Sequence, residues 1–524
     1  MATAMLIASA TIATLPLACT TPPDTSAARP SDDQVATAAP QGTPIDAATA
    51  TATFDAVWSR VNDHHFDPEF NGVDWIAIRE TYRPRIDAVE TQQQLRMVLT
   101  AMLGELGQSH FGLIPGEAFA SDLSDPSDAS DPSDPSDLSD PSDSSDTSDP
   151  SDTSDPSDTS DSSDPSDPSD PSDASGRPGW SGITARFHDG AALVTAVADD
   201  SPASRAGVRP GDTVESIDGR SVARFADLVA SDPDSPMLRY EMNAMLNARL
   251  APAIGERREL ELRNPNGDTR TAVVTGAASP DRMVGMGNLP PMRTTLDHRM
   301  LDAIALSELG LEPCGGDLVG VIAFSVWLPA ISEDFDRAID ASRETLGVVI
   351  DLRGNPGGLG AMAMGFGGHF ADRPISLGTM STRDTSLHFR VNPRRVDRAG
   401  RPVEPLDVPL AIIVDEMSAS TSEIFAGGMQ EAGLARIFGR RTPGFALPAT
   451  ATDLPNGDVL LAAMADFTTP NGVRLEGRGV VPDETIELTP ANLAEGDPDL
   501  RAAAAWILDQ YLMPGEDDAG EPTT

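Results

Sequence analysis

Residues 409–445 have the sequence PLAIIVDEMSASTSEIFAGGMQEAGLARIFGRRTPGF. The apolar residues 410–414 predict a buried strand and residues 422–430 predict a helix, so the turn between them carries Ser420. At such a turn the first N–H groups of the helix have no intrahelical partner and can stabilise an oxyanion. The pattern from Ser420 to Glu423 is also a capping box, in which the hydroxyl only caps the helix. This stretch alone leaves a nucleophile and a cap as alternatives.

Three separated segments together resemble one protease family. Residues 415–428 (DEMSASTSEIFAGG) are similar to the nucleophile segment of the C-terminal processing (tail-specific) serine proteases, whose nucleophile matches Ser420. Residues 347–359 (GVVIDLRGNPGGL) resemble the strand and glycine loop of that family, and residues 474–484 (RLEGRGVVPDE) resemble its closing strand segment. The resemblance extends from about residue 54 to about residue 488.

The domain organisation follows from composition, periodicity and this resemblance. Strand and helix patterns alternate from residue 319 to residue 488, which predicts an α/β layered core. The resemblance implies a multidomain α/β protein with an N-terminal helical domain, a PDZ-like β domain and a ββα-superhelix core of the Clp and crotonase kind. The expected units are a signal peptide with a lipobox (1–19), a disordered tether (20–51), the helical domain (52–119), a Ser/Asp/Pro low-complexity insertion (120–176), the PDZ-like domain (177–277), the protease core (278–489), and a C-terminal helix with an acidic tail (490–524).

The sequence contains no lysine. Most members of the family activate the serine with a lysine in an F-G-K-G segment, and the matching residues here are Pro443, Gly444, Phe445 and Ala446. Arginine cannot take over this role, because its pKa is too high for a general base. The chain therefore either uses another base or is a non-catalytic relative.

Another base is available in the pair Ser109-His110, which follows a predicted helix. In the subgroup typified by the tricorn core peptidase, the catalytic histidine lies in such a Ser-His pair, and a glutamate occupies the position of Glu476. The resemblance therefore implies that His110 is the base for Ser420 and that Ser109 and Glu476 support it. Imidazole, with an unperturbed pKa of ~6.5, can accept the serine proton near neutral pH. The alternative is that His110 only caps or packs a helix end.

Paired glycines in residues 353–359 allow a close approach of the backbone. We expect the amides of Gly357 and Thr421 to form the oxyanion hole. The alternative is a structural one: a tight turn with positive φ would require the same glycines. A phosphate-binding loop is excluded, because no G-K-[ST] follows.

The segment Trp180, Ser181, Gly182 and Ile183 matches the carboxylate-binding loop of a PDZ domain. In such a loop, free N–H groups bind the C-terminus of a peptide while the peptide adds a strand to the sheet. The alternative is a PDZ-like domain that only gates the active site.

The first residues, MATAMLIASATIATLPLAC, form an apolar stretch that is too short for an ordinary transmembrane helix. They predict a signal peptide, and Leu17-Ala18-Cys19 resembles the end of a bacterial lipobox. We therefore expect export to the bacterial cell envelope, with lipidation of Cys19 and exposure to the periplasm or the exterior. Export without a lipid anchor is the alternative.

The net charge of −45 argues against nucleic acid and anionic membrane surfaces as partners. His64 and His65 have no matching ligands at zinc spacing, so we expect no metal and no cofactor. Cys314 has no neighbour that would activate its thiol and is interpreted as structural. The predicted function is an exported serine endopeptidase that cleaves peptides or the C-terminal tails of unfolded proteins. The alternatives are an inactive relative that binds peptides and a scaffold of the cell envelope; the sequence leaves the oligomeric state open.

Overall fold

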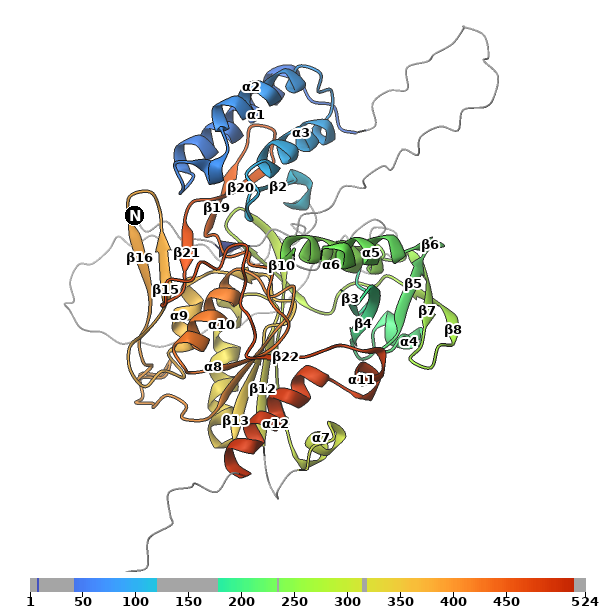
Figure 1. Ribbon diagram of the computed structural model, residues 1–524, viewed down its shortest axis with the longest axis vertical. Helices are drawn as coiled ribbons and strands as arrows, with labels where there is room; N and C mark the ends of the chain where they lie inside the picture. Colours follow the sequence, from blue (N-terminus) through green and yellow to red (C-terminus); the bar gives the residue numbers. More distant parts are fainter. Residues whose placement is uncertain (1–6, 9–41, 120–177, 233–234, 313–317, 513–524) are drawn as a thin grey trace, which may run out of the picture.

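The structure, a computed structural model, describes residues 7–8, 42–119, 178–232, 235–312 and 318–512 (Figure 1). Cys19, Cys314 and the Ser/Asp/Pro insertion lie outside the described residues, as do most of the expected signal peptide and tether. In the part of the chain that is described, no helix has both the length and the hydrophobicity needed to cross a bilayer.

The N-terminal domain is a helical layer. Its helices are α1 (Ala47–His64), α2 (Trp75–Ile86) and α3 (Gln92–Gly104). Helix α1 begins inside the segment predicted as a tether, because the side chain of Asp46 accepts the N–H of Thr49 and caps the helix. The apolar faces predicted from the 3.6-residue period are buried in one cluster, which also contains Leu454 and Leu460 of a core hairpin.

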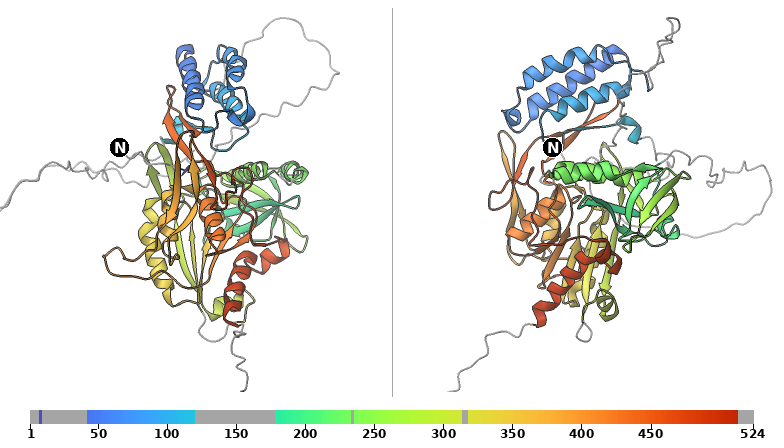
Figure 2. Two further views of the ribbon diagram at one scale, coloured as in Figure 1. Left: turned by 60° about the vertical axis from the view of Figure 1, so that its left-hand side comes forward. Right: turned by 45° about the vertical axis from the view of Figure 1, so that its right-hand side comes forward.

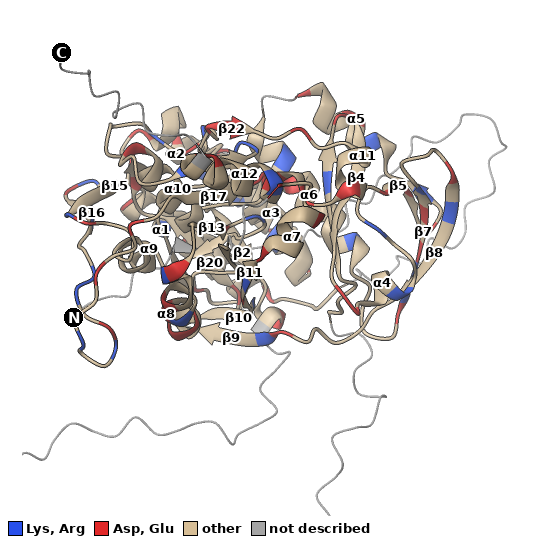
Figure 3. Cartoon of the chain, turned by 90° about the horizontal axis from the view of Figure 1, so that it is seen from below, with Lys and Arg blue, Asp and Glu red and all other residues tan. Residues whose placement is uncertain are grey.

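The PDZ-like domain is an antiparallel sheet with three helices. Its strands have the order β3-β4-β5-β7-β8, which leaves β3 at one edge of the sheet. The strands are β3 (Ile183–His188), β4 (Ala191–Val197), β5 (Thr213–Ile217), β6 (Arg220–Ser221, paired with β5), β7 (Arg257–Arg263) and β8 (Thr269–Thr275); the helices are α4 (Pro202–Arg205), α5 (Ala223–Ser231) and α6 (Pro236–Leu250). Charged residues of both signs alternate with buried leucines along β7 (Figure 3), as expected for a strand whose alternate residues face solvent.

The core is a mixed sheet with helices on both faces, which agrees with the predicted α/β core. Its strand order is β11-β12-β13-β17-β18-β22; β11 is antiparallel to β12, and the other neighbours are parallel. The elements are β11 (Leu296–Leu301), β12 (Val319–Phe324), β13 (Gly347–Asp351), β17 (Leu410–Val414), β18 (Arg436–Gly439), β22 (Glu484–Thr485), α8 (Ser332–Ala341), α9 (Ala361–Gly367), α10 (Thr421–Glu431) and α12 (Pro498–Leu512). Alternate residues of β17 pack toward α8, α9 and α10 or toward α12, so all five are buried.

Smaller elements connect the domains (Figure 2). Strand β2 (Gly112–Ile114), directly after Ser109-His110, pairs with β20 of the core and thereby holds the end of the helical domain against the core. The remaining elements are β1 (Ile7–Ala8), β9 (Arg282–Met286), β10 (Leu289–Thr294), α7 (Ala303–Glu308), β14 (Gly357–Gly358), β15 (Ile375–Ser381), β16 (Ser386–Val391), β19 (Ala449–Asp453), β20 (Val459–Ala463), β21 (Asp466–Thr468) and α11 (Pro490–Glu495).

A buried ion pair joins α3 to the hairpin of β19 and β20. Arg96 donates to both carboxylate oxygens of Asp458, at 2.8 and 2.6 Å, and the side chain of Asp458 is 1% exposed. Truncating Arg96 to alanine would leave the buried carboxylate unpaired. We expect Arg96→Ala to lower the free energy of unfolding of the helical domain by about 3–5 kcal/mol, measured by urea titration with hydrogen exchange of α3 as the signal.

The matched control is Arg79→Ala. Arg79 pairs with Asp55 at 2.8 Å, but both side chains are more than 40% exposed. This change should cost less than about 1 kcal/mol. Equal effects of the two substitutions would contradict the assigned role of the buried pair.

Candidate active site

Ser420 lies at the N-terminus of α10, after the turn that follows β17. Its backbone has φ 58° and ψ −116°, a conformation that is rare for residues other than glycine. The residue is fully buried, and its Oγ forms no hydrogen bond with any described residue. The backbone strain costs roughly 1–3 kcal/mol, and a buried unpaired hydroxyl costs a similar amount. Costs of this kind favour a functional role for Ser420.

Glu423 fixes the backbone of Ser420. The two residues have a capping-box arrangement in which Glu423 Oε2 accepts the N–H of Ser420 at 3.0 Å, but the Ser420 hydroxyl makes no cap hydrogen bond. Glu423 also accepts hydrogen bonds from Thr442 Oγ1 (2.6 Å), the Gly444 amide (2.7 Å) and the Phe445 amide (2.8 Å). Burial raises the pKa of Glu423 to about 7, although the donors oppose this shift. Glu423, predicted from the sequence as part of a capping box, therefore joins the segment of Ser420 to residues 442–445.

Asp415 fixes the other side of the turn. Its Oδ1 accepts the amides of Gly354 (2.9 Å) and Met417 (3.0 Å), and its Oδ2 pairs with Arg186 of β3 at 2.9 and 2.6 Å. Burial alone would raise the pKa of Asp415, but the charges of Arg186 and Arg440 lower this pKa to about 2. Sequence reasoning missed both members of this pair, because nothing local connects a PDZ strand to a core turn.

The glycine loop approaches Ser420 closely. The amide of Gly357, expected as an oxyanion donor, donates to Asn355 Oδ1 at 3.0 Å in this structure, so its role in an oxyanion hole stays a prediction. Asn355 also donates to the Phe324 carbonyl (2.9 Å) and accepts the Ala419 amide (3.0 Å). Gly357 has φ +105°, and a Cβ on it would lie 2.6 Å from Ser420 Cβ. The glycine is thus required by conformation and by space.

Thr421, the other predicted oxyanion donor, is the first residue of α10, where an N–H has no intrahelical partner. Its hydroxyl donates to the carbonyl of Gly358 at 3.0 Å and ties α10 to β14. Strand β14 pairs antiparallel with Ile7 and Ala8 of β1, so an extended chain fits along this edge beside Ser420.

Ser109, His110 and Glu476 come together although they are far apart in the sequence. Ser109 Oγ lies 2.8 Å from His110 Nδ1 and donates to Glu476 Oε2 at 2.8 Å. Glu476 also accepts the amides of Ser109 (2.7 Å) and Ala446 (3.1 Å). Burial raises the pKa of Glu476, whereas these donors lower it. The structure thus brings the supporting pair into contact with the predicted base.

This arrangement determines the tautomer of His110. The Ser109 hydroxyl has one proton, and it uses this proton to donate a hydrogen bond to the Glu476 carboxylate. The Ser109 oxygen therefore accepts a hydrogen bond from His110 Nδ1–H. His110 Nε2 then carries a lone pair, and it is buried without a hydrogen-bond partner among the described residues. Burial lowers the pKa of His110 to about 4, which keeps the ring neutral at physiological pH.

No hydrogen bond joins Ser420 Oγ to His110 Nε2, since each atom lacks a partner in the described part of the chain. Residues 442–446 connect the two groups: Glu423 accepts the amide of Phe445, and Glu476 accepts the amide of Ala446. Phe445, at the position of the family's lysine, packs against Tyr240 of α6 with 4.7 Å between the ring centroids and the rings tilted by 56°.

His65 supports the base segment. Its Nδ1 lies 2.8 Å from the Asp67 carbonyl and its Nε2 lies 2.9 Å from Gln108 Oε1, next to Ser109. The ring stacks on Phe111 at 5.4 Å. The structural role expected for His65 agrees with these contacts.

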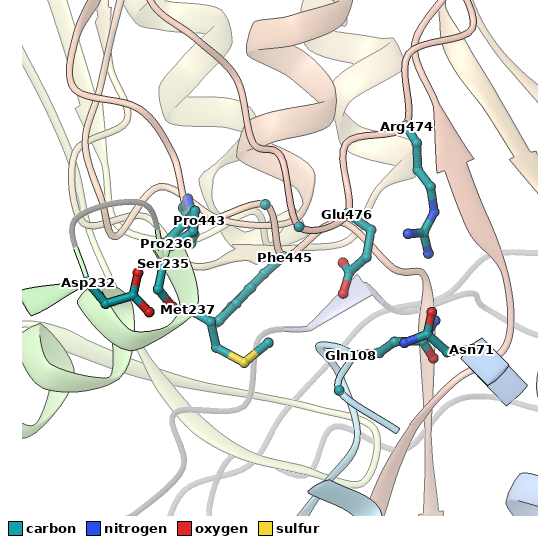
Figure 4. A pocket seen from close by; sticks show the side chains of 13 residues that line it. Asn71, Gln108, Asp232, Ser235, Pro236, Met237, Pro443, Phe445, Arg474 and Glu476 are labelled. Carbon is teal, nitrogen blue, oxygen red and sulfur yellow. The ribbon is translucent and has the colours of Figure 1, made fainter. Parts of the chain in front are cut away.

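A cavity of about 370 Å³ lies where the three domains meet, and Glu476 borders it (Figure 4). Its lining residues are Asn71, Gly107, Gln108, Asp232, Ser235, Pro236, Met237, Pro443, Gly444, Phe445, Arg474, Glu476 and Gly477. Among the described residues, His188, Asp189 and Glu487 are the one group spaced for a metal ion; Asp189 and Glu487 are exposed, and the group lies at the outer end of β3.

Models of known families match three parts of the chain. Peptidase family S41 matches residues 318–486, the tricorn protease C1 domain matches residues 46–104, and a PDZ domain matches residues 193–238. A probable CtpA-like serine protease of Staphylococcus haemolyticus is 23% identical over 298 residues, which cover 56% of this chain and 50% of that relative. Its counterpart in Staphylococcus aureus (strain COL) is 24% identical over 299 residues, with the same coverage.

Among solved structures, mature CPAF superposes with a TM-score of 0.52 over 88% of this chain and 98% of that chain, at 12% identity. This likeness shows a shared fold. The two Staphylococcus relatives are matched over about half of their own length.

Gly357→Ala tests the packing of the glycine loop against Ser420. Because the new methyl would overlap Ser420 Cβ and alanine disfavours the positive φ, we expect reactivity of Ser420 to fall by about 100-fold or more. Gly365→Ala in α9 is the matched control, since a Cβ there meets nothing within 4 Å. The measurement is the rate of Ser420 acylation by an activated ester, followed by intact-protein mass spectrometry; similar rates in both variants would contradict the packing argument.

Proposed function

We propose that this chain, which belongs to the tail-specific protease family, is a serine peptidase in which Ser420 is the nucleophile and His110 is the general base. Two buried atoms without partners carry this proposal: the hydroxyl oxygen of Ser420 and the Nε2 of His110. A nucleophile and a base, each desolvated and unoccupied, are poised for proton transfer when substrate closes the remaining gap.

The reaction follows from the contacts. As Ser420 Oγ attacks the peptide carbonyl, His110 Nε2 takes its proton, and the imidazolium is stabilised through Ser109 by the carboxylate of Glu476. The Thr421 amide faces the developing oxyanion, and Gly357 leaves space for it. His110 then protonates the leaving amine, and a water molecule hydrolyses the acyl-enzyme. The substrate backbone lies along β14, in the place that β1 takes here.

We propose peptides or unfolded protein tails as substrates, since an extended chain fits this edge. The exported, lipid-anchored location implied by residues 1–19 is also part of the proposal. Mass spectrometry of the membrane fraction tests it, with a diacylglyceryl group on Cys19 as the expected result.

The second candidate is an inactive relative that binds peptides. It is favoured by Phe445, which stands in place of the lysine of most family members. Ser420→Ala and His110→Ala distinguish the two. The peptidase account predicts that each lowers the hydrolysis of an unfolded protein by about 1000-fold or more with peptide binding retained.

His388→Ala is the matched control for the base, because His388 is exposed and contacts only the Thr379 side chain among the described hydrogen bonds. It should leave hydrolysis within about twofold of the wild type. If purified Ser420→Ala hydrolyses the unfolded protein as fast as the wild type does, Ser420 is not the nucleophile.

The pH dependence provides a separate test. Because burial lowers the pKa of His110 to about 4, kcat/KM should stay near its plateau at about pH 5.5, where an ordinary histidine base would be mostly protonated. Since the folded-state pKa lies below the unfolded value, His110 also makes the protein less stable as the pH falls from about 6.5 toward 4. An acid limb of kcat/KM centred near pH 6.5 in folded protein would contradict a buried base.

A further inference from the structure

Strand β3 is the edge of the PDZ-like sheet, and this edge is where a peptide would add a strand. Among the described strands, β3 pairs with β4 alone, through residues 183–188. Successive residues of a strand direct their backbone groups to opposite sides. Ala185 and Phe187 are therefore the residues whose N–H and C=O groups a peptide would use.

Helix α6 already occupies three of these four groups, namely both groups of Ala185 and the N–H of Phe187. The side-chain amide of Asn247 accepts the N–H of Ala185 at 3.0 Å and donates to its carbonyl at 2.9 Å. Asn243 Oδ1 accepts the N–H of Phe187 at 2.8 Å. Residues four apart share one face of a helix at a spacing of roughly 5–6 Å, which suits alternate residues of a strand.

Most of the contact is closed to solvent, and Asn247 is half-buried. Ala185 and Asn243 are 0% exposed and Phe187 is 2% exposed. Leu246 and Leu250 of α6 are part of the same apolar cluster as β3. Asn243 Nδ2 is buried without a partner among the described residues, so the closed form has an unsatisfied donor that costs roughly 1–3 kcal/mol.

The predicted carboxylate-binding loop is also partly occupied, which corrects the expectation of free amides. The Trp180 amide donates to the Ala277 carbonyl at 2.8 Å, and the Ile183 amide donates to Ser181 Oγ at 3.2 Å. Gly182 has φ +82° and packs against Ser201. In this conformation, at least two of the four amides cannot bind a peptide carboxylate.

We propose that α6 is an internal ligand of the PDZ-like domain. Its Asn243 and Asn247 amides imitate the backbone of a bound peptide and hold the domain closed, and a peptide adds to β3 only by displacing α6.

The same helix reaches the candidate active site. Tyr240 of α6 packs on Phe445, and Met237 lines the cavity that Glu476 borders (Figure 4). Displacing α6 would remove this support from residues 442–446, which contact both Glu423 and Glu476. This link to catalysis rests on the proposed function, whereas the closure of β3 does not.

Amide hydrogen exchange of the full chain, read by mass spectrometry with residue-level fragmentation, tests the closure. In wild-type protein the amides of Ala185 and Phe187 should exchange at least about 100-fold more slowly than an open sheet edge would. Asn247→Ala should speed exchange at Ala185 by about 10-fold or more. The control is Asn62→Ala in α1, whose side chain hydrogen-bonds only to Asp63 among the described contacts and should change nothing at β3.

Peptide binding completes the test. The probe is a fluorescein-labelled heptapeptide ending in Ala-Ala-Val, compared with its C-terminally amidated form by fluorescence anisotropy. We expect Asn247→Ala to bind the free-carboxylate form about 10-fold more tightly than the wild type does. Fast exchange at Ala185 and Phe187 in the wild type would overturn the proposal even if the variant failed to fold, and unchanged exchange in folded Asn247→Ala would overturn it as well. Wild-type protein that shows slow exchange at Ala185 and Phe187 but does not hydrolyse an unfolded protein would instead count against the proposed function alone.

Discussion

The left-handed backbone of Ser420 is the constraint on which the site depends. This conformation projects the serine from the N-terminus of α10, and it persists only because Glu423 holds the Ser420 amide while Asp415 holds the turn before it. The same two acids bind partners outside the helix. Glu423 accepts hydrogen bonds from the amides of Gly444 and Phe445, and Asp415 forms an ion pair with Arg186 of the PDZ-like domain. The nucleophile is therefore strained and supported from two domains.

Two buried ion pairs join the domains, Arg186–Asp415 and Arg96–Asp458. A buried charge without its partner costs several kcal/mol, so each pair requires its two segments to meet in this register wherever the contact is buried. The first pair fixes the PDZ-like domain at the nucleophile turn. The second fixes the helical domain on the hairpin that pairs with β2, two residues after His110. The proposed base, His110, thus lies next to the strand through which the helical domain contacts the core.

Part of this arrangement was predictable where the pattern is local. The buried strand at 410–414 and the helix after Ser420 agree with the sequence analysis. The contact of Ser109 with His110 and Glu476 is not local, and it was expected only from the family resemblance. The family models, including the S41 domain, agree with the predicted family and fold. The hydrogen bond from the Gly357 amide to the Asn355 side chain was not predicted, because glycine spacing does not encode it.

Other features could not be predicted because their partners are distant in the sequence. Asn243 and Asn247 look like ordinary polar positions of a helix until β3 is placed beside them. Glu423 has the pattern of a capping residue, and only the approach of Phe445 reveals its second role.

The most direct test of the central claim is the rate at which a fluorophosphonate labels Ser420, read by peptide mass spectrometry, in wild-type protein and in His110→Ala. We expect labelling of Ser420 in the wild type near neutral pH. In His110→Ala the labelling rate should be lower by at least about 100-fold. Folded wild-type protein that remains unlabelled would contradict an activated nucleophile, and equal labelling of the two proteins would contradict His110 as its base.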